Sequence, residues 1–288
     1  MNKELQICVN NQIAQGKNVI LNHSKKPYVM KIKNLAGFEV WLVDGEYVRK
    51  FISEDFVNFD QHYHLKFIPK NEFWIDFANK HHEIKYYIDH LYIEGRLMAA
   101  GKTYFQAYKT AAAFEKRERA KSKIMKQIKK EKIPKEKLIK RLHKKLLINH
   151  EIKVWLVDGS LVRSLFFLDF AAGGHDKVYN FIPKNEIWID DDLKDREKKF
   201  IILHEMHERN LMSKGLNYSE AHASATEVED YCRHNCKKTL FYIKSEIEKI
   251  NHPNKIKVAV FDHHPFIRIK KHKRLGIIFR KKKKSSNL

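Results

Sequence analysis

The sequence predicts an α+β fold built from two tandem copies of one small unit. The segments VWLVDGEYVR, FIPKNEFWID and HLYIEGRLMAAGKTYFQAYKTAAAFE recur as VWLVDGSLVR, FIPKNEIWID and HEMHERNLMSKGLNYSEAHASATEVE. Trp41 matches Trp155 and Trp74 matches Trp188, so the copies align without a gap at an offset of 114 residues. Each copy opens with short apolar runs typical of strands and closes with longer helical patterns. Such a repeat indicates that one structural unit was duplicated.

The length and composition agree with two globular units. A chain of 288 residues can bury two modest cores, and a hydrophobic share of 43% is ordinary for a folded protein. The repeat supplies the expected boundaries. They are a lead-in over residues 1–35, a first unit over 36–119, a basic helical connector over 120–150, a second unit over 151–250, and a strand with a basic tail over 251–288.

The first unit is expected to begin with a β-hairpin, because Asp44-Gly45 separates two apolar runs and both residues tolerate positive φ. HLKFIP and EFWID are expected to be short strands around a turn at residues 69–71. A helical hairpin follows, in which Gly101 ends a helix over residues 83–99 and Thr103 caps a second helix. Each unit is thus predicted to be a small antiparallel sheet followed by a helical hairpin.

Similar patterns predict the elements of the connector and of the second unit. Pro134 is expected to open a connector helix with an apolar stripe of Leu138, Leu142 and Leu146. In the second unit we expect a hairpin at residues 155–163, a strand pair at 181–190, a helix at 197–213 and a helix from Ser219 to about residue 250.

The most specific chemistry lies on the first helix of the second unit. His204 and Glu208 are four residues apart, so their side chains share one helix face and can bind the same metal ion. Glu205 is the candidate general base that takes a proton from a metal-bound water. His222, on the following helix, is the expected third ligand. Glu229 shares a face with His222 and is either a fourth ligand or a partner that orients His222.

Residues 204–229 resemble the zincin metallopeptidases, whose His-Glu-x-x-His motif appears here as His204-Glu205-x-x-Glu208. The resemblance implies that His204, Glu208 and His222 bind a divalent metal, zinc first among the candidates, and that Glu205 activates water. It also implies that the strand ending at residues 187–190 aligns the substrate. Glu208 replaces the second histidine of the motif, and a mixed carboxylate and histidine set also suits iron or manganese.

The first copy is an internal control for this hypothesis. It keeps the His-x-x-x-Glu pair as His90 and Glu94, but Leu91 takes the position of the base and Tyr108 that of the third ligand. Leucine cannot accept a proton and tyrosine is a poor zinc ligand, so a metal site is expected in the second unit only. The alternative is that both pairs are intrahelical ion pairs, each stabilising its helix by roughly 0.2–0.5 kcal/mol.

Two further sets of residues are weaker candidates. The turn at residues 173–176 differs between the copies and can bring His175 or Asp176 near the helix site. Cys232 and Cys236 are four residues apart on an expected helix and offer at most two metal ligands.

The sequence thus favours a metal-dependent hydrolase, zincin-like and of peptidase type, with one site. The rival is a non-enzymatic nucleic-acid-binding or assembly protein. A net charge of +22 and a pI of 9.7 favour a polyanionic partner on the basic connector and tail, although lysine-rich composition alone also produces such a charge. Apolar runs are too short to span a membrane, the N-terminal segment lacks an apolar signal core, and three cysteines suit a reducing compartment, so a cytoplasmic location is expected.

Overall fold

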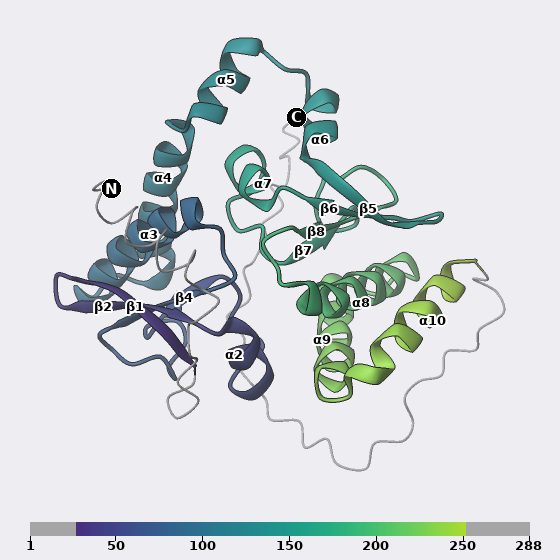
Figure 1. Ribbon diagram of the computed structural model, residues 1–288, viewed down its shortest axis with the longest axis horizontal. Coiled ribbons are helices and arrows are strands. Elements are labelled where there is room, and N and C mark those ends of the chain that lie inside the picture. Colours follow the sequence, from purple (N-terminus) through teal and green to yellow (C-terminus); the bar gives the residue numbers. More distant parts are fainter. Residues whose placement is uncertain (1–26, 252–288) are drawn as a thin grey trace, which may run out of the picture. The chain divides into compact units, whose positions relative to one another are not determined.

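The computed structural model describes residues 27–251, which contain two similar α+β units (Figure 1). The first unit contains β1 (Tyr28–Leu35), β2 (Phe38–Val43), α2 (Gly45–Phe51), β3 (Phe59–Gln61), β4 (Glu72–Asp76), α3 (His81–Ala99) and α4 (Tyr104–Ala120). Helices α5 (Lys123–Glu131) and α6 (Lys135–Leu142) follow. The second unit contains β5 (His143–Asn149), β6 (Lys153–Val157), α7 (Gly159–Leu165), β7 (Gly173–His175), β8 (Glu186–Asp190), α8 (Asp195–Ser213), α9 (Tyr218–His234), the 3₁₀ turn η2 (Cys236–Lys238) and α10 (Thr239–Asn251).

The duplication and the α+β class are confirmed. Each unit has a four-stranded sheet, with the order β1-β2-β4-β3 in the first and β5-β6-β8-β7 in the second. The expected antiparallel sheet is corrected to a mixed one, because β2 and β4 run parallel, as do β6 and β8. Trp41 lies opposite Trp74, and Trp155 opposite Trp188, in these parallel pairs.

The hairpin expected at Asp44-Gly45 is wrong, and so is its copy in the second unit. Asp44 is the N-cap of α2, where its side chain accepts a hydrogen bond from the backbone N–H of Tyr47 at 3.3 Å. A Cβ on Gly45 would lie 1.9 Å from Oδ2 of Asp76, so glycine is needed here for close approach rather than for positive φ. The parallel pair requires a crossover, and α2 begins it.

Other expected boundaries also change. HLKFIP forms turns, whereas the stretch at residues 59–61 is the edge strand β3. Leu146 lies in β5 and not on the helical stripe of the connector, because residues 143–149 pair with β6. The last helix breaks at Asn235, between α9 and η2, instead of continuing to residue 250. The strand expected near residues 256–260 lies outside the described residues.

The helical hairpins agree with the expected stop signals. Gly101 and Gly215 adopt φ values of +84° and +98° directly after α3 and α8. Thr103 forms a capping box with Gln106 at the start of α4. In the second unit Asn217 caps α9, which begins at Tyr218, one residue before the expected start at Ser219. No helix within residues 27–251 combines the length and apolar character needed to cross a membrane.

Helix α8 is buried on two sides, which fixes the orientation of its polar face. Phe200 and Leu203 belong to a core that also contains Ile187 and Ile189 of β8 and Ile243 of α10. Helix α8 packs against both α9 and α10 and also contacts β7. Since the hydrophobic residues of α8 fix its rotation, the side chains at positions 204 and 208 lie between α9 and β7.

Candidate metal centre

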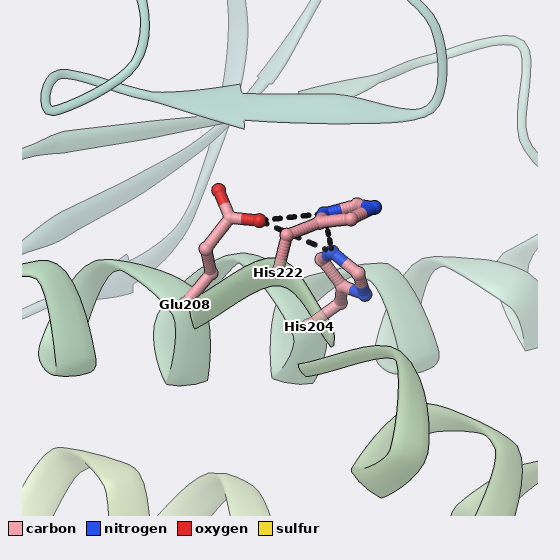
Figure 2. A group of neighbouring side chains, drawn as sticks. All are labelled: His204, Glu208 and His222. Atoms are coloured by element: carbon pink, nitrogen blue, oxygen red, sulfur yellow. Dashed lines mark hydrogen bonds and ion pairs between the residues drawn. The ribbon is translucent and has the colours of Figure 1, made fainter. Parts of the chain in front are cut away.

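Three of the expected ligands lie together. His204 and Glu208 lie on successive turns of α8, and His222 reaches them from α9, so that the three side chains point toward one another (Figure 2). His204 Nε2 lies 3.2 Å from His222 Nδ1 and 3.6 Å from Glu208 Oε2, and the last two atoms are 2.7 Å apart. These residues form a group that could hold a metal ion.

The spacing of the three atoms suits direct coordination. The separations place the atoms on a circle of radius about 1.9 Å, so an ion about 1 Å above their plane lies about 2.1 Å from each, the bond length of zinc sites. An ideal tetrahedral ion would lie about 0.7 Å above such a plane. The separation of 2.7 Å between His222 and Glu208 is a hydrogen bond, in which a proton occupies the space between the two ligand atoms.

Glu229 orients His204. Its Oε2 accepts a hydrogen bond from His204 Nδ1 at 2.8 Å, and its Oε1 accepts one from Arg233 Nε at 2.8 Å. Glu229 was expected to be a fourth ligand or a partner of His222, but it contacts His204 instead. A carboxylate on Nδ1 directs the opposite nitrogen of the imidazole, Nε2, toward His222 and Glu208, as outer partners of metal-binding histidines do.

His175, in strand β7, orients Glu208. The backbone N–H of Lys177 donates to His175 Nδ1 at 3.2 Å, so the ring proton lies on Nε2, which donates to Glu208 Oε1 at 2.9 Å. Glu208 Oε2 is thereby directed toward His204 and His222. A second group could also hold a metal ion, since the potential ligand atoms of His175, Glu205 and Glu208 lie within 4.8 Å of one another. The proton on Nε2, however, makes His175 a hydrogen-bond donor to Glu208 rather than a metal ligand.

The charges of the group are strongly coupled. Burial lowers the pKa of His204, but hydrogen bonds to Glu208 and Glu229 outweigh burial and raise this pKa to about 10. Burial also acts to raise the pKa of Glu208, yet hydrogen bonds from His175, His204 and His222 hold it far below its usual range. Without a metal, the proton on His204 therefore offsets part of the carboxylate charge at neutral pH.

Glu205 lies in a cleft of about 140 Å³ beside this group. Burial, and then the negative charge of Glu208, raise the pKa of Glu205 to about 8. Gly173 of β7 makes room for this carboxylate, because a Cβ on Gly173 would lie 3.1 Å from both Cγ and Oε1 of Glu205 and 2.8 Å from Cγ2 of Ile201. Tyr179 also lines the cleft.

The first unit shares the contacts that orient the histidine and the glutamate of α8. His90 Nδ1 contacts Glu115 at 2.7 Å, and Gln61, at the position of His175, donates to Glu94 Oε1 at 2.8 Å. His90 and Glu94 thus form a buried pair without a second imidazole, which agrees with the ion-pair interpretation for this copy.

The residues that form the cleft are replaced in the first unit. Phe59 takes the position of Gly173 and stacks on Tyr87 with ring centroids 4.3 Å apart. Leu91, at the position of Glu205, is 1% exposed within an apolar cluster. Tyr108, at the position of His222, donates a hydrogen bond to Asp169 of the second unit. The two copies therefore differ at the second imidazole of the group, His222, at the carboxylate of Glu205 and at the glycine that makes room for that carboxylate.

Of the weaker candidates, His175 lies beside the group as expected, whereas Asp176 and the two cysteines do not join it. Asp176 forms an ion pair with Arg209 at 2.6 Å. Cys232 is buried in α9 whereas Cys236 is exposed after the helix ends, so the two thiols do not share a helix face.

His207 lies apart from the group and contacts α9 and α10. Its Nδ1 contacts Glu246 Oε1 at 2.8 Å and its Nε2 contacts Ser224 Oγ at 3.0 Å. This order resembles a Ser-His-Glu triad, but Ser224 lies within α9, where backbone N–H groups are used by the helix and are not available to stabilise an oxyanion.

No protein-family model matches the chain, and comparison with curated proteins and with solved structures gives no significant similarity. The roles of Gly173 and Tyr179 were missed from the sequence. The role of Gly173 could have been found by comparing the copies, because Phe59 of the first copy is aligned with Gly173 of the second.

Proposed function

We propose that the protein is a metal-dependent hydrolase of zincin-like chemistry, with one active centre in its second unit. The observation that carries this proposal is the position of His204 Nε2, His222 Nδ1 and Glu208 Oε2 around one point, beside a cleft that also contains Glu205. A purely structural ion pair of one histidine and one glutamate requires neither a second imidazole nor an adjacent carboxylate with a raised pKa.

The donor set favours zinc. Two imidazole nitrogens and one carboxylate oxygen form a set used by catalytic zinc sites, in which the fourth position holds water or substrate. The three donors lie on one side of the ion position derived above, which leaves a coordination position for water. A bound zinc ion would polarise the substrate carbonyl and make this water acidic.

The protein side chains would then divide the remaining tasks. Glu205 accepts the proton of the attacking water and later donates it to the leaving group. Glu229 fixes the orientation of His204, and His175 fixes that of Glu208. The reaction class is hydrolysis of an amide or ester carbonyl, and we propose peptides as the first substrates to test.

Metal titration of the 288-residue chain, purified without chelator and then stripped of metal, tests the site. We expect one zinc ion per chain. Replacing His222 by the residue of the first copy, His222→Tyr, should weaken zinc affinity by about 100-fold, because each ligand of a protein zinc site contributes roughly 3 kcal/mol. Tyr108→Phe at the matching position of the first copy should leave affinity unchanged. Absence of zinc uptake by the wild-type protein would refute the proposal.

Hydrolysis tests the role of Glu205. The zinc-loaded protein should cleave members of a quenched fluorescent peptide library, and a chelator should abolish cleavage. Glu205→Gln should retain zinc but lose at least about 100-fold in rate, as expected for loss of a general base. If Glu205→Gln cleaves as fast as the wild type, the assigned role of Glu205 is wrong.

A further inference from the structure

A continuous chain of buried charges links His204 to the first unit. Glu229 Oε2 contacts His204, and Glu229 Oε1 accepts from Arg233 Nε at 2.8 Å. Arg233 Nη1 donates to Glu197 Oε1 at 2.7 Å, and Arg49 Nε, from helix α2 of the first unit, donates to Glu197 Oε2 at 2.8 Å. The candidate metal centre is therefore connected to the other copy through four consecutive ion pairs, of which the first is that between His204 and Glu229.

The mirror image of this chain starts from the first unit. His90 contacts Glu115, Glu115 accepts from Arg119, and Arg119 donates to Glu83 at 2.7 Å. Glu83 Oε2 then accepts from Arg163 Nε of the second unit at 2.7 Å. Every member of this chain is the repeat counterpart of one in the first chain. The contacts between the units are thus reciprocal, like those of a two-fold symmetric dimer, but only one chain ends at three potential ligands.

Glu197 is the residue through which Arg49 can act. Its side chain is 1% exposed, and each of its two oxygens is occupied by a different arginine. Without the Arg49 contact, Glu197 Oε2 would be a buried and unpaired charge, which is costly. The carboxylate would then turn toward Arg233 and compete for the N–H groups that hold Glu229.

Arg49 is also rigidly held within the first unit. Its Nη1 donates to Asp76 Oδ2 at 2.8 Å and to the backbone carbonyl of Val57 at 3.0 Å. The planar guanidinium thereby spans partners on both sides, which the single ammonium of a lysine cannot do with the same geometry. Helix α2 packs against α9, the helix that carries Glu229 and His222.

We propose that Arg49, contributed by the copy that lacks the site, is a positioning residue for His204, acting through Glu197, Arg233 and Glu229. This inference rests on the proposed metal function for its biological meaning, but the positioning itself is a property of the metal-free protein. The first unit then serves as a structural support that completes the active centre of the second.

Two variants with a mirror control test the positioning in the metal-free 288-residue chain. Arg49→Lys and Glu197→Gln should shift or broaden the NMR signal of the hydrogen-bonded Nδ1 proton of His204 and leave that of His90 unchanged. Glu83→Gln, the mirror of Glu197→Gln, should do the reverse. Equal effects of all three variants on both histidines, or none on His204, would overturn the proposal. If Arg49→Lys does not fold, the two glutamine variants still provide the comparison.

Zinc titration of the same variants gives the second measurement, under conditions where urea unfolding shows that each is folded. Arg49→Lys and Glu197→Gln should weaken zinc affinity by about 10- to 100-fold, the usual effect of losing a partner that orients a ligand. Glu83→Gln should stay within about twofold of the wild type. Zinc affinities that are the same in all variants would refute the functional importance of Arg49. If the wild type binds no zinc but the His204 signal responds as expected, the proposed function fails while the positioning stands.

Discussion

Glu205 should destabilise the metal-free protein at alkaline pH, so that Glu205→Gln is more stable than the wild type. Burial and the charge of Glu208 raise the pKa of this carboxyl from 4.5 to about 8. Below pH 4.5 the group is protonated in the folded and unfolded states alike, and it has no effect. Between pH 4.5 and 8 the unfolded chain ionises first, so the free energy of unfolding falls as pH rises.

The size of this effect follows from the pKa difference. A pKa change of one corresponds to about 1.4 kcal/mol. A rise in the pKa of Glu205 from 4.5 to about 8 therefore corresponds to roughly 5 kcal/mol for a fully enclosed group. Glu205 is partly exposed to the cleft, where water screens its charge. We therefore expect Glu205→Gln to gain about 2–4 kcal/mol at pH 8.5. For a protein of this size, that gain raises Tm by roughly 5–10 °C.

Urea unfolding of the metal-free wild type and of Glu205→Gln, at pH 4.5 and at pH 8.5, measures the difference. Glu227 provides a control, because it lies exposed on α9 and Glu227→Gln removes the same charge without a buried environment. This control should change stability by less than about 0.5 kcal/mol at either pH. A gain for Glu205→Gln of the same size at both pH values would refute the reasoning, since the stabilisation would then not arise from ionisation.

Two other substitutions test neighbouring parts of the structure. Gly173→Ala places a methyl group 2.8 Å from Ile201 Cγ2 and 3.1 Å from Glu205, so peptide hydrolysis should fall by about 10- to 100-fold while zinc titration shows unchanged affinity. An equal loss of hydrolysis and of zinc affinity in Gly173→Ala would contradict this prediction. Burial acts to raise the pKa of Glu246, but the hydrogen bond from His207 outweighs burial and lowers this pKa to about 2. The ionised Glu246 therefore stabilises the folded protein above pH 4.5, and this contribution is lost as pH falls toward 2. Glu246→Gln should therefore lower the free energy of unfolding by about 2 kcal/mol at pH 7 and by much less at pH 2.5, as measured by urea unfolding.

The two copies separate scaffold from chemistry at individual positions. The orienting contacts recur, with Gln61 in place of His175 and Glu115 in place of Glu229. What differs is the space beside them. In the second unit a glycine at position 173 leaves room for a carboxylate, whereas in the first unit Phe59 fills the same position with an aromatic ring. Retention of the orienting contacts therefore does not imply retention of a site.

Helical parts of the fold were predictable from the sequence because their signals are local. Gly101 and Gly215 end helices where expected, and Thr103 caps the helix that follows. The sheet was harder, because strand direction depends on partners far apart in sequence. Asp44-Gly45 has the composition of a hairpin turn, but Gly45 is needed for its close approach to Asp76, and the flanking strand pairs in parallel.

The sequence by itself determined the duplication, the α+β class and the face of α8 on which His204 and Glu208 lie, since helical periodicity and an internal repeat need no tertiary information. Only the tertiary structure decided that His222 comes within 3.2 Å of His204 and that Glu229 orients His204 rather than His222. The physical reason is that these contacts depend on how α9 packs against α8. Likewise, the link from Arg49 to Glu197 spans 148 residues and exists only because the two units pack reciprocally.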